Sequence, residues 1–301
     1  MTDKHAARSI ALVTARVARA QDTDLTLLAA ALEEQGASAS IVDWDDVEVD
    51  WSKFKMAVLR SAWDYSARLG EFLDWLERAA LATRLVNPPE VIRWSLDKHY
   101  LAELQRAGVP TVPTAFVEPG VEAAAVVGNF LRQHPAAEFV VKPAVGSGAR
   151  DAQRLPRSAI SELSVQVSRL LAARRSVLLQ PYLERVDVRG ETALIYIQGQ
   201  FSHAIGKTAV LHRGHAPTQE LFAPEQIAAR AARTDELALG AQLFRLLPFA
   251  TPLYARLDLL RDANGAPCVL ELELAEPSLY LGYSEQAPRR MASALIELAQ
   301  S

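Results

Sequence analysis

The stretch that decides the fold of this chain is Ala255-Arg-Leu-Asp-Leu-Leu-Arg-Asp-Ala-Asn-Gly-Ala-Pro-Cys-Val-Leu-Glu-Leu-Glu-Leu274. The Asn264-Gly265 dipeptide inside it predicts a β-hairpin with a two-residue turn, in which both turn positions need positive φ. Pairing that is symmetric about this dipeptide places Asp258 opposite Glu271. It likewise places Arg256 opposite Glu273. Side chains of a strand alternate between two faces, so these four share one face. The other face is left to leucines, namely Leu257, Leu259, Leu270 and Leu272.

The charged face of this hairpin has two interpretations. Directly opposed carboxylates repel, so Asp258 and Glu271 should destabilise a sheet unless a cation lies between them. Carboxylate oxygens beside a phosphate are the usual setting for Mg²⁺. A solvated face of an amphipathic hairpin explains the same residues equally well. The hairpin alone does not choose between these two, and the rest of the chain favours the metal site.

The composition is that of an ordinary globular protein. Of the 301 residues, 50% are hydrophobic and 23% are charged, which suits two or three compact units. The net charge of −4 gives no reason to expect a nucleic-acid partner. Cys268 is the only cysteine, so an internal disulfide is excluded and a reducing cytoplasm is expected. No apolar stretch approaches the roughly 20 residues of a membrane span, so no membrane partner is expected. Whether the chain forms a homo-oligomer stays open.

Strands and helices alternate along the first third of the chain. Apolar runs predict strands at residues 10–14, 40–43 and 56–60, and helices at 25–35 and 69–82, the first of them capped by Asp24. This alternation favours a small open α/β unit with a parallel sheet. Ligands collect at the carboxyl ends of strands in such sheets, which marks Arg16, Asp22 and residues 61–65 as candidates.

The remaining two thirds mix helices and strands. The pattern predicts strands at 114–117, 139–143, 177–182, 191–198 and 201–210 beside the hairpin, and helices at 97–107, 121–133, 158–173, 234–247 and 285–299. Lys142 ends one apolar strand, and Gly146 and Gly148 just after it can bring backbone N–H groups close to an anion. This loop lacks the Gly-Lys-Ser/Thr ending of a P-loop, so a plain turn explains it as well.

The ordered set of these motifs resembles the ATP-grasp superfamily. The set consists of Lys98, Val141-Lys142-Pro143 with its glycine-rich loop, Leu179-Gln-Pro-Tyr-Leu-Glu184, Arg256-Leu-Asp258 and Glu271-Leu-Glu273. The resemblance covers roughly residues 95–281 and implies an α/β and α+β fold in which two α+β subdomains clamp ATP. It implies a Rossmann-like pre-ATP-grasp domain at 1–95, a small subdomain with a glycine-rich flap at 96–181, and a large subdomain with the metal-binding hairpin at 182–301.

The resemblance also implies an ATP site. Two lysines under the flap would contact the phosphates, and the end of one strand would line the adenine. These residues are Lys98, Lys142, Gly146, Ser147, Gly148, Gln180, Tyr182 and Leu183. The ribose would meet Asp187 or Glu184, and this choice stays open.

Phosphoryl transfer needs a divalent metal and cations around the phosphate. By resemblance, Lys207 and Arg256 would steady the transferring phosphate. Two Mg²⁺ ions, replaceable by Mn²⁺, would be held by Asp258, Glu271 and Glu273. The usual Glu-x-Asn of the superfamily is Glu271-x-Glu273 here, which changes one ligand and keeps the site. A structural ion pair with Glu273 is the alternative role for Arg256.

More narrowly, the whole chain resembles the cyclo-ligases of D-cycloserine biosynthesis. The segments that carry this resemblance are Thr14-Ala-Arg16, Val42-Asp-Trp44, Arg60-Ser-Ala-Trp-Asp-Tyr65 and Asn87-Pro-Pro-Glu-Val-Ile-Arg-Trp94-Ser-Leu-Asp-Lys98. It implies an enzyme of antibiotic biosynthesis, an ATP-dependent carbon–nitrogen ligase that forms ADP and phosphate. The carboxylate of O-ureido-D-serine would become an acyl phosphate, and ring closure to D-cycloserine would release carbon dioxide and ammonia.

A zwitterionic amino acid needs an acid for its ammonium and a donor for its ureido carbonyl. Asp64, with Trp63 and Tyr65 as walls, would meet the first need, and Arg16 the second. Ser278 would also face the substrate. The alternative is that the two aromatics belong to the core and that Asp64 caps a helix.

Two rival functions are kept beside the cyclo-ligase. A ligase of the same fold could join a small carboxylate to an amine or an amino acid, and it would need a second substrate, whereas ring closure needs none. A nucleotide-binding module without catalysis is the other rival. The charges retained at Lys142, Arg256, Asp258 and Glu271 argue against such a module, because a site that has lost its activity tends to lose charges that are costly to hold together.

Overall fold

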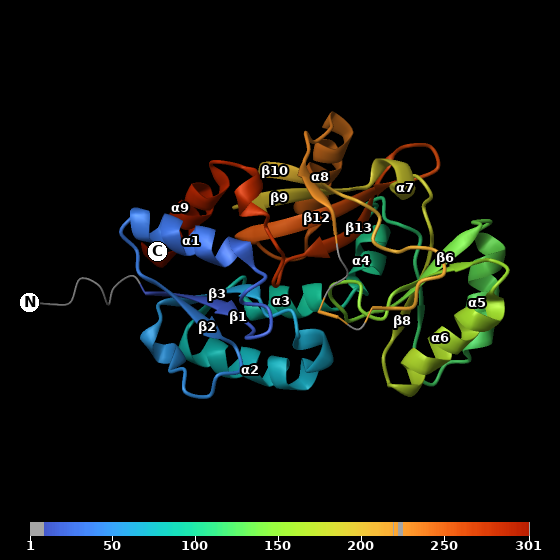
Figure 1. Ribbon diagram of the computed structural model, residues 1–301, viewed down its shortest axis with the longest axis horizontal. Coiled ribbons are helices and arrows are strands. Elements are labelled where there is room, and N and C mark those ends of the chain that lie inside the picture. Colours follow the sequence, from blue (N-terminus) through green and yellow to red (C-terminus); the bar gives the residue numbers. More distant parts are fainter. Residues whose placement is uncertain (1–8, 219, 222–224, 301) are drawn as a thin grey trace, which may run out of the picture.

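Three β-sheets form the framework of the chain in a computed structural model that describes residues 9–218, 220–221 and 225–300 (Figure 1). A sheet near the N-terminus has the strand order β2-β1-β3-β4, and the other two have the orders β5-β8-β6-β7 and β11-β10-β9-β12-β13. Each sheet lies within one of the three expected units, whose boundaries stay a prediction. In the described part of the chain, no helix combines the length and the apolar character needed to cross a bilayer.

The N-terminal sheet is the open parallel sheet that the alternating pattern predicts. Its strands are β1 (Ile10–Thr14), β2 (Ala39–Asp43), β3 (Met56–Ser61) and β4 (Arg84–Val86), and all neighbours are parallel. Helix α1 (Thr23–Glu34) packs on the face that carries Ile10 and Leu12, and α2 (Leu69–Ala82) packs on the face that carries Ala11 and Val13. Successive strand residues point to opposite sides of the sheet, so the two helices together bury both of its faces.

The cap of α1 corrects the sequence prediction. Asp22, in extended conformation, accepts a hydrogen bond from the backbone N–H of Asp24 at 2.9 Å and is the N-cap. Asp24, which was expected to be the cap, lies in the first turn. Its carboxylate accepts from the backbone N–H groups of Leu279 and Leu281 at 2.7 Å each. Asp24 therefore ties the C-terminal segment to the start of α1.

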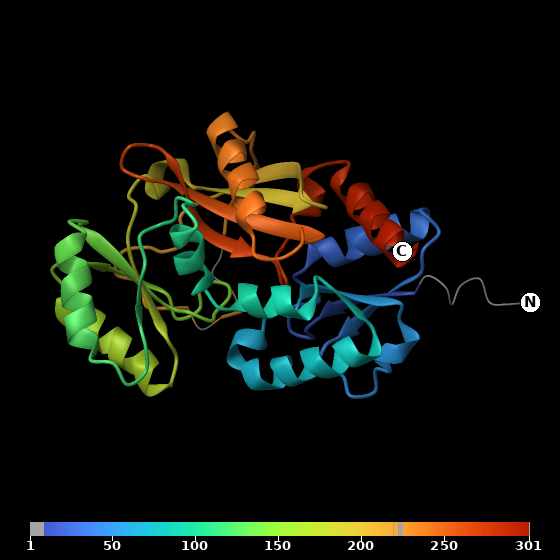
Figure 2. The same cartoon turned by 180° about the vertical axis from the view of Figure 1, so that it is seen from behind.

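The large sheet is antiparallel and contains the hairpin. Its strands are β9 (Glu191–Ile197), β10 (Gln200–Lys207), β11 (Ile227–Ala229), β12 (Tyr254–Arg261) and β13 (Pro267–Glu273). Arg256 pairs with Glu273 and Asp258 with Glu271, as the sequence predicts. Helix α8 (Thr234–Leu246) covers the leucine face through Leu239 and Leu243 (Figure 2).

The turn of this hairpin differs from the prediction. Asp262 and Ala266 close a three-residue loop, with Asp262 N–H donating to Ala266 O at 2.9 Å and Gly265 N–H donating to Asp262 O at 3.0 Å. Only Gly265 in this loop has positive φ, at 83°, which is the three-residue loop geometry and not the two-residue turn. The pairing is consequently shifted by one residue near the loop, where Leu259 faces Val269.

A β-bulge restores the predicted pairing. The register shifts between Asp258 and Leu259, so Leu270 is left without a partner residue on β12. Val269 and Leu272 lie in the buried cluster under α8, whereas Leu270 and Glu271 both line the cavity on the opposite face. Leu270, expected in the core, thus joins the functional face.

The third sheet forms a smaller layer with two helices. Its strands are β5 (Ala115–Val117), β6 (Glu138–Pro143), β7 (Gln153–Pro156) and β8 (Val177–Pro181), and α5 (Ala123–Gln133) and α6 (Ile160–Ala172) pack on one side of it (Figure 1). Strand β7 was not predicted, since Gln153–Pro156 is short and carries little alternation. The short α7 (Val186–Arg189) follows β8.

The helix expected at 97–107 is shorter and has a neighbour that was missed. Helix α3 (Pro89–Leu96) was not predicted, and α4 (Tyr100–Arg106) begins three residues later than expected. Between them, Asp97 forms an isolated bridge with Val145, and Lys98 N–H donates to Ala144 O at 3.0 Å. Lys98 therefore lies in a turn against the glycine-rich loop and not on a helix surface.

The C-terminal helix α9 (Ala287–Gln300) packs against α1 (Figure 1). Met291 and Leu295 of α9 share one buried cluster with Leu25 and Leu28 of α1 and with residues of the large sheet. The two ends of the described chain are joined through this cluster, so the N-terminal unit and the large sheet form one packed body.

Candidate active site

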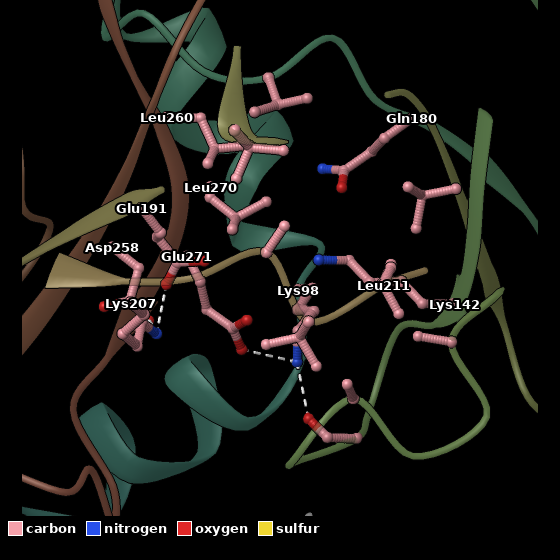
Figure 3. Close-up of a pocket in the computed structure, with 18 of the residues that line it drawn as sticks. Lys98, Lys142, Gln180, Glu191, Lys207, Leu211, Asp258, Leu260, Leu270 and Glu271 are labelled. Atoms are coloured by element: carbon pink, nitrogen blue, oxygen red, sulfur yellow. Dashed lines mark hydrogen bonds and ion pairs between the residues drawn. The ribbon is translucent and has the colours of Figure 1, made fainter. Parts of the chain in front are cut away.

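Two adjoining cavities lie where the three sheets meet. The first, of about 200 Å³, is lined by the charged face of the hairpin, by β6 and β8, and by the glycine-rich loop (Figure 3). The second, of about 270 Å³, lies toward the N-terminal unit and is lined by residues around Asp22, Trp63 and Ser278. Arg256, Glu273, Ser147, Gly148 and Glu225 line both cavities. A group held at Arg256 is therefore accessible from either side.

The first cavity has an apolar end and a charged end. Leu260, Leu270 and Leu211 point into its apolar end, on the side of Gln180 (Figure 3). Acidic and basic side chains gather at the other end, where Asp258, Glu191, Glu271 and Lys207 lie together in Figure 3. The bulge produces this contrast because it turns two adjacent residues, Leu270 and Glu271, toward the same cavity. A ligand with a flat apolar part and an anionic part matches this division.

A buried network of charges surrounds Asp258. Lys207 Nζ lies 3.0 Å from Asp258 Oδ2 and also pairs with Glu191. Arg256 Nε lies 3.0 Å from Asp258 Oδ1, and the same guanidinium pairs with Glu273. Burial opposes the ionisation of Asp258, but Arg256 and Lys207 outweigh it and lower its pKa. Burial likewise opposes the charge of Lys207, whereas Asp258 and Glu191 raise its pKa well above the usual range.

The outer members of this network hold their protons more tightly. Burial raises the pKa of Glu191 to about 7, against the nearby Lys207. Burial, opposed by Arg256 and reinforced by the charge of Glu271, raises the pKa of Glu273 to about 8. In the network around Asp258, three carboxylates therefore share two cations, Lys207 and Arg256, and this part of the site favours an added cation.

Two lysines extend from the opposite wall. Lys98 Nζ lies 2.8 Å from Glu271 Oε1 and donates to Gly146 O at 2.7 Å (Figure 3). Lys142, on β6, points into the same space (Figure 3), and burial lowers its pKa although Glu271 opposes this. A nearby anion would favour the charged form of Lys142, which makes this lysine a suitable phosphate contact.

The glycine-rich loop connects the cavities to the N-terminal unit. Ser147 Oγ donates to Trp63 O at 3.0 Å and lies 3.3 Å from Ser66 Oγ. Gly148 has positive φ, at 60°, which a residue with a Cβ adopts only with strain. The loop lies over the junction between the two cavities, where Arg256 and Glu273 are found.

The structure brings most of the expected ATP and metal residues together. The first cavity is lined by Lys98, Lys142, Gly146, Ser147, Gly148, Gln180, Tyr182, Leu183, Lys207, Arg256, Asp258, Glu271 and Glu273. Neither carboxylate expected at the ribose lines it. Asp187 instead accepts from both terminal nitrogens of Arg154 at 3.0 Å and from the hydroxyl of Tyr182. Glu191, at the start of β9, does line the cavity and was missed, because one glutamate opening a strand carries no distinctive sequence signal.

The expected substrate residues are divided by the structure. Trp63 and Ser278 line the second cavity. Arg16 extends into solvent near Asp43, with its Nε 3.8 Å from the carboxylate. Asp64 accepts from Trp44 Nε1 at 2.8 Å and Arg68 Nη1 at 3.3 Å. Tyr65 is buried beside Phe72. Tyr65 therefore fits the core alternative, whereas Asp64 bonds to Trp44 and Arg68 without capping a helix through its side chain. Arg16, Asp64 and Tyr65 do not line the second cavity.

The carboxylates suit Mg²⁺ in chemistry but are shared among cations in this arrangement. Oxygen donors from Asp258, Glu271 and Glu273 are the kind that Mg²⁺ prefers. Each is now paired, with Lys207, Lys98 and Arg256 respectively. Within residues 9–218, 220–221 and 225–300, no group of three or more His, Cys, Asp or Glu side chains is spaced to hold a metal. Metal loading therefore has to exchange ion pairs for metal–oxygen contacts.

Relatives in sequence point to one family. The chain is 44% identical over 297 residues to the cycloserine biosynthesis protein DcsG of Streptomyces lavendulae, covering 96% of this chain and 98% of that protein. Residues 10–87 match the family described as D-cycloserine synthetase DcsG, N-terminal domain.

Solved structures agree. The crystal structure of D-cycloserine synthetase DcsG matches with a TM-score of 0.90 at 43% identity, over 97% of this chain and 99% of that one. The D-alanine–D-alanine ligase of Bacillus anthracis, solved with ATP, matches in fold with a TM-score of 0.66 at 15% identity over 97% of both chains. The resemblance to the ATP-grasp fold is thereby confirmed, and the enzyme is an ATP-dependent carbon–nitrogen ligase. The chain belongs to the D-cycloserine synthetase family of ATP-grasp ligases.

Proposed function

We propose that the chain is the cyclo-ligase that closes O-ureido-D-serine to D-cycloserine, using ATP and Mg²⁺. The observation that carries this proposal is the position of Arg256, which lines both cavities together with Glu273. A phosphate held in the first cavity and a carboxylate held in the second would meet at this residue. The relative that shares 44% of its sequence is named for cycloserine biosynthesis, which supports the choice of substrate.

The residues divide into an adenine end and a phosphate end. The apolar end of the first cavity, with Leu260, Leu270 and Leu211 beside Gln180, suits an adenine ring. Lys98 and Lys142 would contact the phosphates, and the loop at Gly146 to Gly148 would lie over them. Lys207 and Arg256 would stabilise the charge of the transferring phosphoryl group. Glu191 lines the first cavity, whereas Asp187 and Glu184 do not. Glu191 would therefore be the carboxylate that contacts the ribose or lies beside the phosphates.

Mg²⁺, when bound, neutralises phosphate charge and orients the γ-phosphoryl group for in-line transfer. Asp258, Glu271 and Glu273 would hold two such ions. The present partners of these carboxylates, Lys98 and Arg256, would then be free to turn toward the phosphates. Trp63, Tyr280 and Tyr283 line the second cavity, where the reacting carboxylate would lie.

The reaction needs no general base of its own. One oxygen of the substrate carboxylate bonds to the γ-phosphorus, and ADP leaves. The ureido nitrogen that carries the side-chain oxygen then attacks the acyl carbon, and phosphate leaves with the pair of electrons of the broken C–O bond. Addition of one water releases the carbamoyl group as carbon dioxide and ammonia. The nucleophile belongs to the same molecule, so its effective concentration is high and the enzyme has only to fold and activate the substrate.

The acyl phosphate is tested with substrate labelled by ¹⁸O in its carboxylate. We expect one ¹⁸O atom in the inorganic phosphate that is released, because the oxygen that bonds to phosphorus leaves with it. Mass spectrometry of the phosphate measures this transfer. Unlabelled phosphate, formed together with cyclised product, would contradict the acyl-phosphate route.

A further inference from the structure

The second cavity has an acidic lining. Five carboxyl groups line it, from Asp22, Asp24, Glu225, Glu273 and Glu276, and Arg256 is the basic residue among its lining residues. At about 270 Å³ it lies just below the roughly 300–1,000 Å³ of common small-molecule sites, so it suits a small amino acid. The question is which of these carboxylates is available to a ligand.

Glu225 is exposed and already accepts from the hydroxyl of Tyr280 at 3.3 Å. Two of the other four are held by groups of the fold. Asp24 accepts from two backbone N–H groups at 2.7 Å each, and its Oδ2 lies 3.6 Å from Arg60 Nη2. Glu273 pairs with Arg256. Asp24 is thereby committed to the fold, and Glu273 to Arg256.

Asp22 retains one free acceptor. Its Oδ1 caps α1 through the N–H of Asp24, whereas its Oδ2 is buried and has no hydrogen-bond partner. The residue is only 5% exposed. A buried carboxylate oxygen without a donor costs free energy, and native structures rarely keep one without a reason. A donor supplied by a ligand would remove this cost.

Glu276 is the second available carboxylate. It is 7% exposed, and among the described residues its carboxylate is not part of an ion pair and accepts only from its own backbone N–H. Its backbone is held firmly, because Trp63 Nε1 donates to Glu276 O at 3.0 Å and Arg60 Nη2 donates to Pro277 O at 2.7 Å. These contacts fix the main chain and leave the side chain to the cavity.

We propose that Asp22 and Glu276 form the subsite for the α-ammonium group of the substrate, the role that the sequence assigned to Asp64. This rests on the proposed function, because it takes the substrate to be an amino acid. With the ammonium between these two carboxylates, the substrate carboxylate extends toward Arg256 at the junction with the first cavity. The two ends of a zwitterion thus meet opposite charges in one cavity.

The variants Asp22→Asn and Glu276→Gln test this subsite. Asparagine keeps the cap of α1, and glutamine keeps the shape of Glu276, so both proteins should fold. Asp50→Asn is the matched control, since Asp50 also caps a short helix, through the N–H of Ser52, on the exposed surface of the N-terminal unit. Calorimetry measures the binding of O-ureido-D-serine and of its analogue without the α-amino group to protein saturated with Mg²⁺ and a non-hydrolysable ATP analogue.

We expect the amino compound to bind the unaltered protein about 10- to 100-fold more tightly than its deamino analogue, the effect of one charge-assisted hydrogen bond or two. Each variant should lose most of this preference and keep its affinity for the ATP analogue, while the control keeps both. Variants that retain the full preference would overturn the subsite. If the unaltered protein binds O-ureido-D-serine with this preference but releases no phosphate when ATP replaces the analogue, the proposed function is refuted and the subsite is retained. No binding of either compound would refute both.

Discussion

The buried acidic residues around the two cavities differ in whether a lysine or an arginine pairs with them. Asp258, Glu271 and Glu273 are each held by a lysine or arginine, and Glu276 is not. Paired carboxylates can exchange their partner for a metal ion, whereas an unpaired buried one needs a cation from outside. At the residue scale, we therefore propose that the site is divided between metal binding and substrate binding.

Glu271→Gln tests the metal assignment. Glutamine keeps the volume and removes the charge that would bind Mg²⁺, so we expect turnover to fall by at least about 100-fold. The circular dichroism spectrum and the affinity for ATP without metal should be little changed. Glu33→Gln, on the exposed side of α1, is the matched control. Turnover like that of the unaltered enzyme would remove Glu271 from the metal site.

Asp64→Asn tests the corrected role of Asp64. Its carboxylate bonds to Trp44 Nε1 and Arg68, and it lines neither cavity. Asparagine can still accept from Trp44, so we expect a loss of at most about 1 kcal/mol in unfolding free energy. Steady-state kinetics should give the same KM for the amino acid and for ATP. A selective rise in the KM for the amino acid would return Asp64 to the substrate site.

Glu276→Gln should alter the pH dependence of stability. Burial, reduced by the charge of Lys98, raises the pKa of Glu276 from 4.5 to about 7. The folded state therefore keeps a proton that the unfolded state has lost, and this group destabilises the fold as pH rises from about 5 to about 8. Glutamine does not titrate, so the variant should gain stability relative to the unaltered protein over that range. Urea unfolding at both pH values measures this, and a constant difference would contradict the raised pKa.

The strand residues of the hairpin are those whose shared face could be predicted from local sequence alone. Alternation places Arg256, Asp258 and Glu271 on one face whatever lies opposite. Arg16 and Asp64 could not be placed in this way, because their partners Asp43 and Trp44 come from another strand end. Asp22 and Glu276 become a pair only when the chain end returns to α1, which no local pattern encodes.

At the scale of elements, the hairpin combines two irregularities. The three-residue loop shifts the pairing by one residue, and the bulge at Leu270 shifts it back before Glu271. The sequence predicts the correct partners for Asp258 and Glu271 through a turn that the chain does not form. The bulge itself was not predictable, because Leu270 fits the alternating pattern of a regular strand.

Substitutions in the loop distinguish the two turn types. In a two-residue turn, alanine at either central position would be strained, because both need positive φ. In the observed loop only Gly265 has positive φ. We expect Gly265→Ala to cost about 1 kcal/mol in unfolding free energy and Asn264→Ala to cost much less. Thermal or urea unfolding of the two variants measures this, and equal losses would favour the two-residue turn.

At the scale of the molecule, three sheets meet around two cavities that share Arg256. The parallel sheet and the ATP-grasp fold followed from apolar patterning and the order of motifs. The packing of α9 on α1 could not be predicted, because the sequence of an amphipathic helix does not specify which surface its apolar face packs against. That packing brings the segment after β13 beside Asp22 and so completes the second cavity.

The cyclo-ligase and a ligase that joins two molecules differ in what they require. Ring closure within one substrate needs a single amino acid beside ATP, whereas an intermolecular ligase also needs an amine. The requirement for a second substrate therefore distinguishes the two functions.

The most direct measurement is to mix the protein with ATP, Mg²⁺ and O-ureido-D-serine, without any other amine, and to follow phosphate release together with product mass. We predict phosphate release with a product of the mass of D-cycloserine. No release under these conditions, but release when an amine or a second amino acid is added with another carboxylate, would contradict the cyclo-ligase and assign the same site to an intermolecular ligase.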